Sequence, residues 1–270
     1  MTLRAFQKEV YGYYKKEGRT LPWRPGTKKP DPYKIFVSEI MLQQTQVDRV
    51  IPKFALFLKQ FPSFRALAAA SQADVIRSWQ GLGYNRRAIN LHRSAGQIVQ
   101  EHKGHVPKDT EALLTLPGVG PYTASALRAF IYNIPDVLIE TNVRSAYLRA
   151  FFPGDEKVSD RELFPLIAKT IDTKNPREWY YALMDYGAMQ KRTIGNESRR
   201  SAHYSKQSVF KGSARQIRGR IVAALSKHAS MTTVELVRAC ATPKARVEKE
   251  ITRLIAEGFI VNTKGYFSLR

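Results

Sequence analysis

The chain has 270 residues, with 44 Lys plus Arg against 23 Asp plus Glu, which gives a formal net charge of +21 at pH 7. Because 43% of the residues are hydrophobic and 11% are aromatic, this charge indicates a folded protein with a polyanionic partner rather than a disordered basic tail. Nucleic acid is the first candidate for that partner, and an anionic membrane surface is the second.

The N-terminal sequence lacks the apolar stretch of a signal peptide, and no apolar run reaches the roughly 18 residues of a membrane span. We therefore expect a cytoplasmic protein, associated with the nucleoid if the source is prokaryotic. Cys240 is the only cysteine, so the chain cannot build a disulfide, a cysteine-ligated zinc site or an iron–sulfur cluster. His102 and His105 lie at an expected helix end without a third ligand nearby, and we predict no metal held by side chains.

Three segments follow one another along the chain. Residues 1–190 show helical periodicity interrupted by prolines and almost no strand-like alternation, which predicts an all-α domain. Residues 191–213 are rich in Ser, Gly, Lys and Arg and read as a basic linker that could also contact phosphates. Residues 214–270 predict three helices and then two short strands around Asn262–Gly265, the order of a winged helix-turn-helix domain. Basic residues on its third helix favour DNA contact, although a role in protein contacts remains open.

The stretch "IFVSEIMLQQTQV" surrounds Glu39 with apolar residues on nearly every side of an expected helix. Such a helix should be buried, and burial raises the pKa of a carboxyl group, so that Glu39 could donate a proton near neutral pH. The alternative is a glutamate that turns to the surface or pairs with an arginine. Gln43 and Gln44, one turn later, suit hydrogen bonding to base edges, or they are ordinary exposed residues.

The stretch "WQGLGYNRRAINLHR" places an aromatic side chain in a glycine-rich turn before a basic helix. Tyr84 could stack on a base while Arg86, Arg87 and Arg93 hold phosphates. The alternative is an aromatic residue packed into the core beside a solvated basic face.

The stretch "LLTLPGVGPYTASALRAF" places Gly118 and Gly120 between two helical segments, with Pro121 ready to start the second. Glycines allow a positive φ, and the free N–H groups of the following helix could face a phosphate oxygen. A tight turn between helices would use the same residues without any ligand.

In "VLIETNVRSAYLR", a single acidic residue, Glu140, precedes an expected basic helix. The helix dipole favours a negative charge at this position, and Thr141 could cap the free N–H groups.

Six stretches in this order resemble the helix-hairpin-helix DNA glycosylases, and most closely the MutY-type adenine DNA glycosylases. They are "LPWR", "DPYKIFVSEIMLQQTQV", "WQGLGYNRRAINLH", "VPKDTEALLTLPGVGPYTASAL", "ETNVRSAYLR" and "ALMDYGAM", and they cover about residues 5–190. The resemblance implies an all-α fold of two lobes, with DNA in the cleft between them and the target nucleotide flipped out.

The resemblance also implies roles for four residues in catalysis. Glu39 would protonate the departing adenine, and Glu140 stands where the family has an aspartate that stabilises the oxocarbenium-like sugar. Tyr122 would support that carboxylate, and Asn142 would hold the same neighbourhood. Related bifunctional enzymes have a lysine at the position of Tyr122, so its absence predicts a monofunctional glycosylase without Schiff-base lyase chemistry.

The expected partner is double-stranded DNA with a mismatch or lesion, bound by a monomer. Gln44 and Tyr84 would enter the duplex, and the turn Leu116–Gly120 would hold a backbone phosphate, with a possible monovalent cation. The residues expected to contact DNA are Arg24, Gln43, Gln44, Tyr84, Arg86, Leu116, Gly118, Val119, Gly120, Lys191 and Arg192.

The sequence departs from the family in four places. Lys191 stands at the first of four cysteine positions, so we expect no iron–sulfur cluster and no other cofactor. The winged helix occupies the place of the domain that recognises 8-oxoguanine. Glu140 is one methylene longer than aspartate and reaches about 1 Å further, a displacement that can cost about 10² in rate. Tyr181 falls where the family has a polar residue of the base pocket, which weakens the assignment of adenine.

The resulting hypothesis is a monofunctional glycosylase of base excision repair that removes adenine opposite 8-oxoguanine or guanine. One alternative keeps the chemistry but changes the base to thymine or uracil opposite guanine, or to a modified base, because of Tyr181 and Glu140. The other alternative is a DNA-binding protein without catalytic activity.

Overall fold

The computed structural model describes residues 1–26, 29–206 and 209–270. The chain forms two compact units. Unit 1 comprises Met1–Glu39, Pro107–Thr115 and Val119–Lys206, and unit 2 comprises Ile40–Val106, Leu116–Gly118 and Gln207–Arg270.

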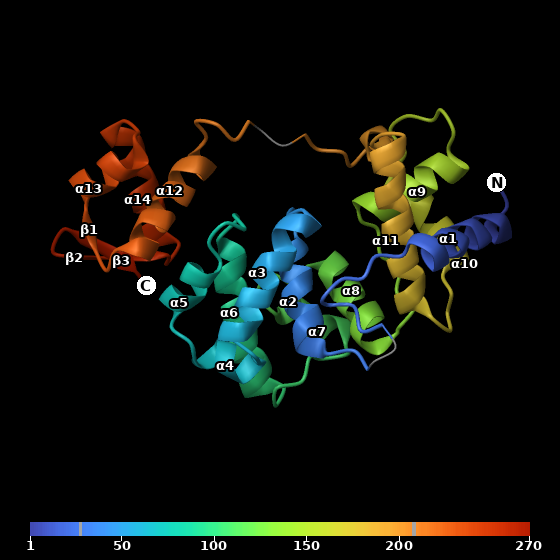
Figure 1. The fold of residues 1–270 in the computed structure, drawn as a ribbon, viewed down its shortest axis with the longest axis horizontal. Helices are drawn as coiled ribbons and strands as arrows, with labels where there is room; N and C mark the ends of the chain where they lie inside the picture. The colour runs from blue at the N-terminus through green and yellow to red at the C-terminus, as the bar shows by residue number, and fades with distance from the viewer. Residues whose placement is uncertain (27–28, 207–208) are drawn as a thin grey trace. The chain divides into compact units, whose positions relative to one another are not determined.

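Helices account for nearly all regular structure in both units, as predicted (Figure 1). Helix α2, Pro32–Leu42, begins in unit 1 and ends in unit 2. The other helices of unit 1 are α1 Leu3–Glu17, α7 Thr110–Thr115, α8 Pro121–Tyr132, α9 Thr141–Phe151, α10 Asp160–Thr170, α11 Pro176–Thr193 and the 3-10 helix η1 Glu197–Arg200. Those of unit 2 are α3 Val47–Gln60, α4 Phe64–Ala69, α5 Gln72–Ser78, α6 Arg86–Glu101, α12 Ala214–Lys227, α13 Thr233–Cys240 and α14 Lys244–Ala256.

Unit 1 is built around α11, which packs against α9, α8 and α1 (Figure 1). An aromatic cluster joins three of these helices: the ring of Phe6 on α1 lies edge-on to Tyr147 of α9 and to Trp179 of α11, with ring centroids 4.9 Å and 6.2 Å apart. All three side chains are fully buried. Such aromatic pairs contribute more than their buried area alone, so this cluster holds the middle of α9 against α1 and α11.

The hairpin between α7 and α8 forms as its sequence predicts. Gly118 has φ +83°, which favours glycine, and Gly120 is the N-cap residue of α8 with Pro121 in the first turn. The first N–H groups of α8 therefore follow directly after the glycine turn.

The C-terminal part of unit 2 has three helices and a small antiparallel sheet, which confirms the predicted winged-helix order. Strands β2 Ile260–Thr263 and β3 Tyr266–Leu269 form the hairpin, with Lys264 and Gly265 at φ 52° and 86° in its two-residue loop. A third strand, β1 Met231–Thr232, pairs with β3 and gives the order β1-β3-β2. Two residues are too short for an alternating pattern, so the sequence did not reveal β1.

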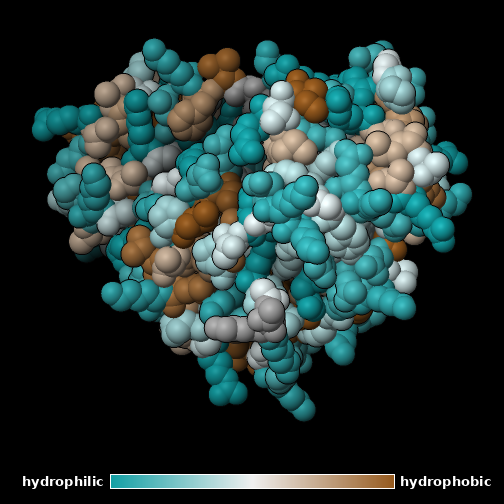
Figure 2. Space-filling model, turned by 45° about the vertical axis from the view of Figure 1, so that its right-hand side comes forward, coloured by the Kyte–Doolittle hydropathy of each residue, from teal (hydrophilic) through white to brown (hydrophobic). Residues whose placement is uncertain are grey.

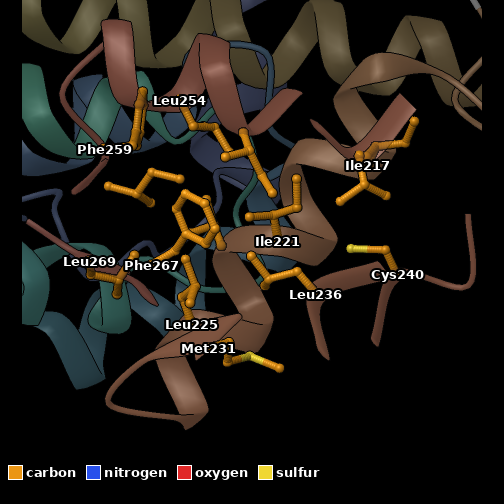
Figure 3. Packing of buried hydrophobic residues seen from close by; sticks show 14 of the residues in the cluster. Ile217, Ile221, Leu225, Met231, Leu236, Cys240, Leu254, Phe259, Phe267 and Leu269 are labelled. Carbon is orange, nitrogen blue, oxygen red and sulfur yellow. The ribbon is translucent and has the colours of Figure 1, made fainter. Parts of the chain in front are cut away.

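The winged helix has an apolar core, which Figure 3 shows from close by. Its labelled apolar side chains, among them Ile221, Leu254 and Phe259, point toward one another from α12, α14 and the segment after α14. Ile76 of α5 and Ile89 of α6 belong to the same buried cluster. The winged helix is therefore packed onto the helices of unit 2.

The predicted linker, 191–213, contains ordered structure near its start. Helix α11 extends to Thr193 and η1 follows. Arg200 donates hydrogen bonds to the carbonyl oxygens of Phe152 and Asp155, at 2.6 Å and 2.9 Å, and Ser201 forms a bridge with Val158. Side-chain bonds to backbone thus hold this segment against the end of α9.

Hydrophilic residues cover most of the face in Figure 2, with hydrophobic residues in small separate groups. Among the helices that the structure describes, none has the length and apolar character needed to cross a membrane.

Candidate active site

Glu39 lies in a helix whose other side chains are almost all apolar. Ile35, Phe36, Val37 and Ile40 are each at most 2% exposed, and Glu39 itself is 9% exposed. Burial is the main cause that raises the pKa of Glu39 to about 8, and the nearby charge of Glu140 adds to it while Arg24 opposes it. Glu39 therefore holds its proton at neutral pH.

Glu140 is the N-cap residue of α9. Its Oε1 accepts hydrogen bonds from the backbone N–H groups of Asn142 and Val143, at 2.8 Å and 2.9 Å, and its Oε2 lies 3.3 Å from Nδ2 of Asn142. The sequence suggested Thr141 as the cap, but Thr141 is the first residue inside the helix. The longer glutamate folds back onto its own helix start, which fixes its carboxylate.

The environment of Glu140 acts on its pKa in both directions. Burial raises the pKa of Glu140 above its ordinary value, while the two backbone N–H groups and Arg144 lower it. Among the described residues, no hydrogen-bond donor lowers the pKa of Glu39 in this way, so the surroundings of Glu140 favour its charged form more than those of Glu39 do.

Tyr122 belongs to the same group of side chains. Burial raises the pKa of its phenol well above the ordinary value, and the charges of Glu39 and Glu140 raise it further. A phenol in this setting stays neutral, so that its hydroxyl can donate a hydrogen bond to a carboxylate. The structure thus brings together Glu39, Glu140, Tyr122 and Asn142, the four residues predicted for catalysis.

Gly187 on α11 allows α9 to approach closely. A Cβ atom built at Gly187 would lie 2.1 Å from the backbone oxygen of Asn142 and 2.6 Å from its carbonyl carbon. Any side chain here would push away the helix start that carries Glu140, so Gly187 sets the position of the carboxylate.

A buried ion pair forms another wall of the site. The carboxylate of Asp185 is fully buried and accepts hydrogen bonds from Arg19 Nε at 2.7 Å and from both terminal nitrogens of Arg24 at 2.8 Å. The guanidinium of Arg24 also lies 4.5 Å from the ring centre of Tyr181, which stacks on Phe130 with centroids 4.9 Å apart. Arg24 was expected at the DNA, whereas its side chain is 7% exposed, and we assign it to this pocket.

In unit 2, Arg87 organises two segments expected to contact DNA. Its guanidinium donates to the carbonyl oxygens of Ile40, Met41 and Gln43 at the end of α2, at 2.7–3.0 Å. It also donates to the carbonyl oxygens of the turn before α6. Since both segments bind one buried cation, their backbones are fixed relative to each other.

The two side chains expected to enter the duplex sit in these segments. Gln44 and Tyr84 have φ 56° and 47°, a left-handed conformation that costs energy in non-glycine residues. Both are exposed, with Tyr84 at 38%. Gln43 instead donates to the carbonyl oxygen of Gly118 at 3.1 Å and ties α2 to the glycine turn.

The remaining residues expected at the DNA differ in exposure. Leu116 and Val119 are 2% and 6% exposed and support the turn, whereas Gly118 is exposed at its tip. Arg86 is exposed and pairs with Glu257 at 2.7 Å. Lys191 and Arg192 are exposed in the last turn of α11, and Gly120 is half-buried.

The sequence reading missed three residues that build the site. Arg87 was expected to hold a phosphate, with a solvated basic face as the alternative, yet it is buried on one stripe of α6 with Leu91, Ser94 and Ile98, a spacing visible in the sequence. Asp185 and Gly187 act through contacts with residues more than 40 positions away, which no local pattern indicates.

Residues 37–186 match the family described as HhH-GPD superfamily base excision DNA repair protein. The adenine DNA glycosylase of Mycolicibacterium smegmatis is 33% identical over 280 residues, which cover 97% of this chain and 94% of that protein. The adenine DNA glycosylase of Mycobacterium tuberculosis is 35% identical, over 96% of this chain and 92% of that protein.

Among solved structures, a thermostable thymine-DNA glycosylase aligns with a TM-score of 0.61. The alignment covers 75% of this chain and 96% of that one at 22% sequence identity. At this identity the likeness shows a shared fold.

The close approach of α9 and α11 predicts opposite effects for two glycine substitutions. Gly187→Ala should lower the free energy of unfolding by about 3 kcal/mol or more, because its Cβ would overlap a backbone carbonyl. The matched control, Gly12→Ala at an exposed position of α1, has nothing within 4 Å of the added Cβ and should raise the free energy of unfolding by about 0.5–1 kcal/mol. Urea unfolding measures both, and equal effects would contradict the proposed contact.

Proposed function

Because the chain belongs to the HhH-GPD superfamily of base excision DNA repair proteins, we propose that it is a monofunctional glycosylase that removes adenine from mispairs. The observation that carries this proposal is a pair of buried carboxyl groups in different settings: burial raises the pKa of Glu39 to about 8, whereas the carboxylate of Glu140 accepts two backbone hydrogen bonds that oppose the effect of burial on its pKa. Breaking an N-glycosidic bond requires both, a proton for the leaving base and a negative charge near the sugar.

The reaction uses these groups in sequence. Glu39 gives its proton to a ring nitrogen of adenine, the bond between C1′ and the base breaks, and the electron pair leaves with the base. The carboxylate of Glu140 stabilises the positive charge that develops on the sugar, and Tyr122 supports that carboxylate by hydrogen bonding. A water molecule adds to C1′ and gives one proton to the carboxylate that Glu39 became in the first step, which leaves an abasic sugar and restores the acid.

Tyr122 also defines the class of glycosylase. A lyase of this kind needs an amine that forms a Schiff base, and a neutral phenol cannot form one. We therefore propose that the strand stays intact after base release.

The buried aromatic pair suits a flat base. Tyr181 stacks on Phe130 beside Arg24, whose Nε is buried and has no hydrogen-bond partner among the described residues. A buried donor without a partner is costly unless a ligand supplies an acceptor. A purine has such acceptors on its ring nitrogens, which supports adenine despite the change to Tyr181.

We further propose that the enzyme acts as a monomer on double-stranded DNA, in the compartment that holds the chromosome, without an iron–sulfur cluster. One cysteine cannot ligate a cluster. The contacts of Arg200 and Ser201 supply the order that cluster ligands would give to the segment after α11. A monovalent cation at the Leu116–Gly120 turn remains a prediction.

A panel of duplexes tests the proposal. Each duplex carries one mispaired or damaged base, and alkali-sensitive strand breaks report base release. We expect release of adenine opposite 8-oxoguanine and opposite guanine. Release of thymine or uracil opposite guanine instead would favour a different base for the same chemistry, and no release from any duplex would favour a DNA-binding role.

The pKa of Glu39 predicts the pH dependence of base release. The general acid must be protonated, so the single-turnover rate should fall about tenfold per pH unit above pH 8, where Glu39 ionises. On the acid side, the rate should fall as Glu140 becomes protonated. Because burial raises the pKa of Glu140, this fall should begin at a higher pH than the ordinary pKa of glutamate would give. A rate that is flat from pH 7 to pH 10 would contradict the role of Glu39.

Glu39→Gln is the control for this profile. The substitution should abolish base release, because glutamine has no acidic proton to give. It should also stabilise the fold: Glu39 loses its proton at a lower pH in the unfolded state than in the folded state, so a rise in pH favours unfolding of the protein that carries Glu39. The gain should be on the order of 3 kcal/mol at pH 7, grow up to pH 8 and vanish below pH 4. Unfolding measured across this range separates a stable inactive variant from a misfolded one.

Glu140→Asp tests whether the pocket is built around the longer acid. Aspartate is a favoured N-cap, so the free energy of unfolding should change by less than about 1 kcal/mol. Its carboxylate would be drawn back by about 1 Å, which should slow base release by about 10². A faster rate would show instead that the glutamate slows base release relative to the aspartate that the family has at this position.

A further inference from the structure

Helix α1 has an exposed basic face. Its opposite face buries Phe6 and Val10 and packs against α10 and α11 (Figure 1). Residues three or four positions apart lie on the same side of a helix. By this spacing, one exposed face, which we call the α1 face, comprises Arg4, Ala5, Lys8, Gly12, Lys15 and Lys16.

The positive charge of the α1 face is not compensated. Within the described parts of the chain, none of its basic side chains forms an ion pair, whereas Lys244 on α14 pairs with Glu248. Of the two acidic residues of α1, Glu9 accepts a hydrogen bond from the hydroxyl of Tyr186, and Glu17 ends the helix. The α1 face therefore presents positive charge to the solvent.

Two residues of the α1 face cost stability without any gain inside the fold. Arg4 lies in the first turn of α1, where the helix dipole disfavours a positive charge. Gly12 lies in the middle of the helix, where glycine costs about 0.5–1 kcal/mol relative to alanine. A Cβ atom at Gly12 would have nothing within 4 Å, so packing within the chain does not require a glycine. Such departures from local preference indicate a function outside the fold.

The phosphate backbone of a duplex is the partner that this chemistry fits. From Arg4 to Lys16 the helix rises by about 18 Å, and duplex DNA carries one negative charge per about 1.7 Å of its axis, so several phosphates can face the helix. The missing side chain at Gly12 would let the helix approach a sugar–phosphate strand closely. A lipid surface fits less well, because helices that lie on membranes insert large apolar side chains, and the six residues of the α1 face include none.

The α1 face is separate from the residues of the active site. Gly187 of α11 lies against Asn142 of α9, whereas α11 meets α1 through Trp179 and Tyr186, which contact the ring of Phe6. The α1 face is turned away from that contact. We propose that it binds the phosphate backbone of duplex DNA without regard to sequence or lesion, with the backbone of α1 close to the strand at Gly12.

The salt dependence of binding tests this inference. The test variant combines Arg4→Gln, Lys8→Gln and Lys15→Gln in the Glu39→Gln background, in which no base release is expected. Fluorescence anisotropy gives Kd for an undamaged duplex and for a duplex with a mispaired adenine over a range of salt concentrations. The slope of log Kd against log salt should fall by about 2–3 for both duplexes, because each phosphate contact contributes about 0.9 to it.

The matched control removes the same charge from exposed lysines elsewhere, in a variant that combines Lys59→Gln, Lys169→Gln and Lys227→Gln. These substitutions should change the slope much less. An equal change for the two variants would show that only the net charge matters and would overturn the inference. A change in slope for the mismatched duplex alone would also overturn it, since backbone binding does not depend on the lesion.

Gly12→Gln tests the close approach without changing the charge. Glutamine favours helix more than glycine does, so the free energy of unfolding should rise while duplex binding weakens several-fold. Gly96→Gln in α6, where an added Cβ also has nothing within 4 Å, should leave binding unchanged. Unchanged binding by Gly12→Gln would contradict the inference.

Vesicles that contain phosphatidylserine distinguish the other polyanionic surface. We expect the α1 variants to lose affinity for the duplex and to differ little from the parent protein on vesicles. If they lose affinity for vesicles and keep it for the duplex, the partner of the α1 face is a membrane and the inference fails.

Discussion

Two carboxyl groups buried close together cannot both be ionised at low cost, and the arrangement of unit 1 depends on how this conflict is resolved. Backbone N–H groups at the start of α9 favour the charged form of Glu140, and the apolar faces of α2 favour the neutral form of Glu39. Each carboxyl thus favours the protonation state that the proposed reaction requires. The helix contact at Gly187 keeps the donors in place.

The sequence predicted those features that depend on neighbours along the chain. The burial of Glu39 follows from apolar residues around one helix, and the turn at Gly118 follows from glycine and proline spacing. Features that depend on distant contacts could not be predicted. Asp185 meets Arg24 from 161 positions away, and Gly187 lies against the backbone of Asn142 on another helix. The cap of α9 is local, but the sequence also offered Thr141, and glutamate is not among the favoured N-cap residues.

The winged helix shows the same division between local and distant information. Its helices and hairpin were predicted from capping and turn residues, and the structure confirms their order. Its place on α5 and α6 depends on Ile76 and Ile89, which carry no mark in the sequence that distinguishes them from other core residues. Through this packing, a C-terminal domain of different design comes to lie beside the Tyr84 turn.

Salt should act differently on the exposed charges of the protein and on the buried ion pair of Asp185 and Arg24. Mobile ions screen exposed charges within about a Debye length, so a protein of net charge +21 should lose duplex affinity steeply as salt rises. Asp185 and Arg24 are shielded from those ions, because their side chains are 0% and 7% exposed. The charges around Asp185 should therefore stay constant as salt rises while the affinity for DNA falls, so in the proposed reaction salt should change how often a duplex binds rather than how fast a bound base is released.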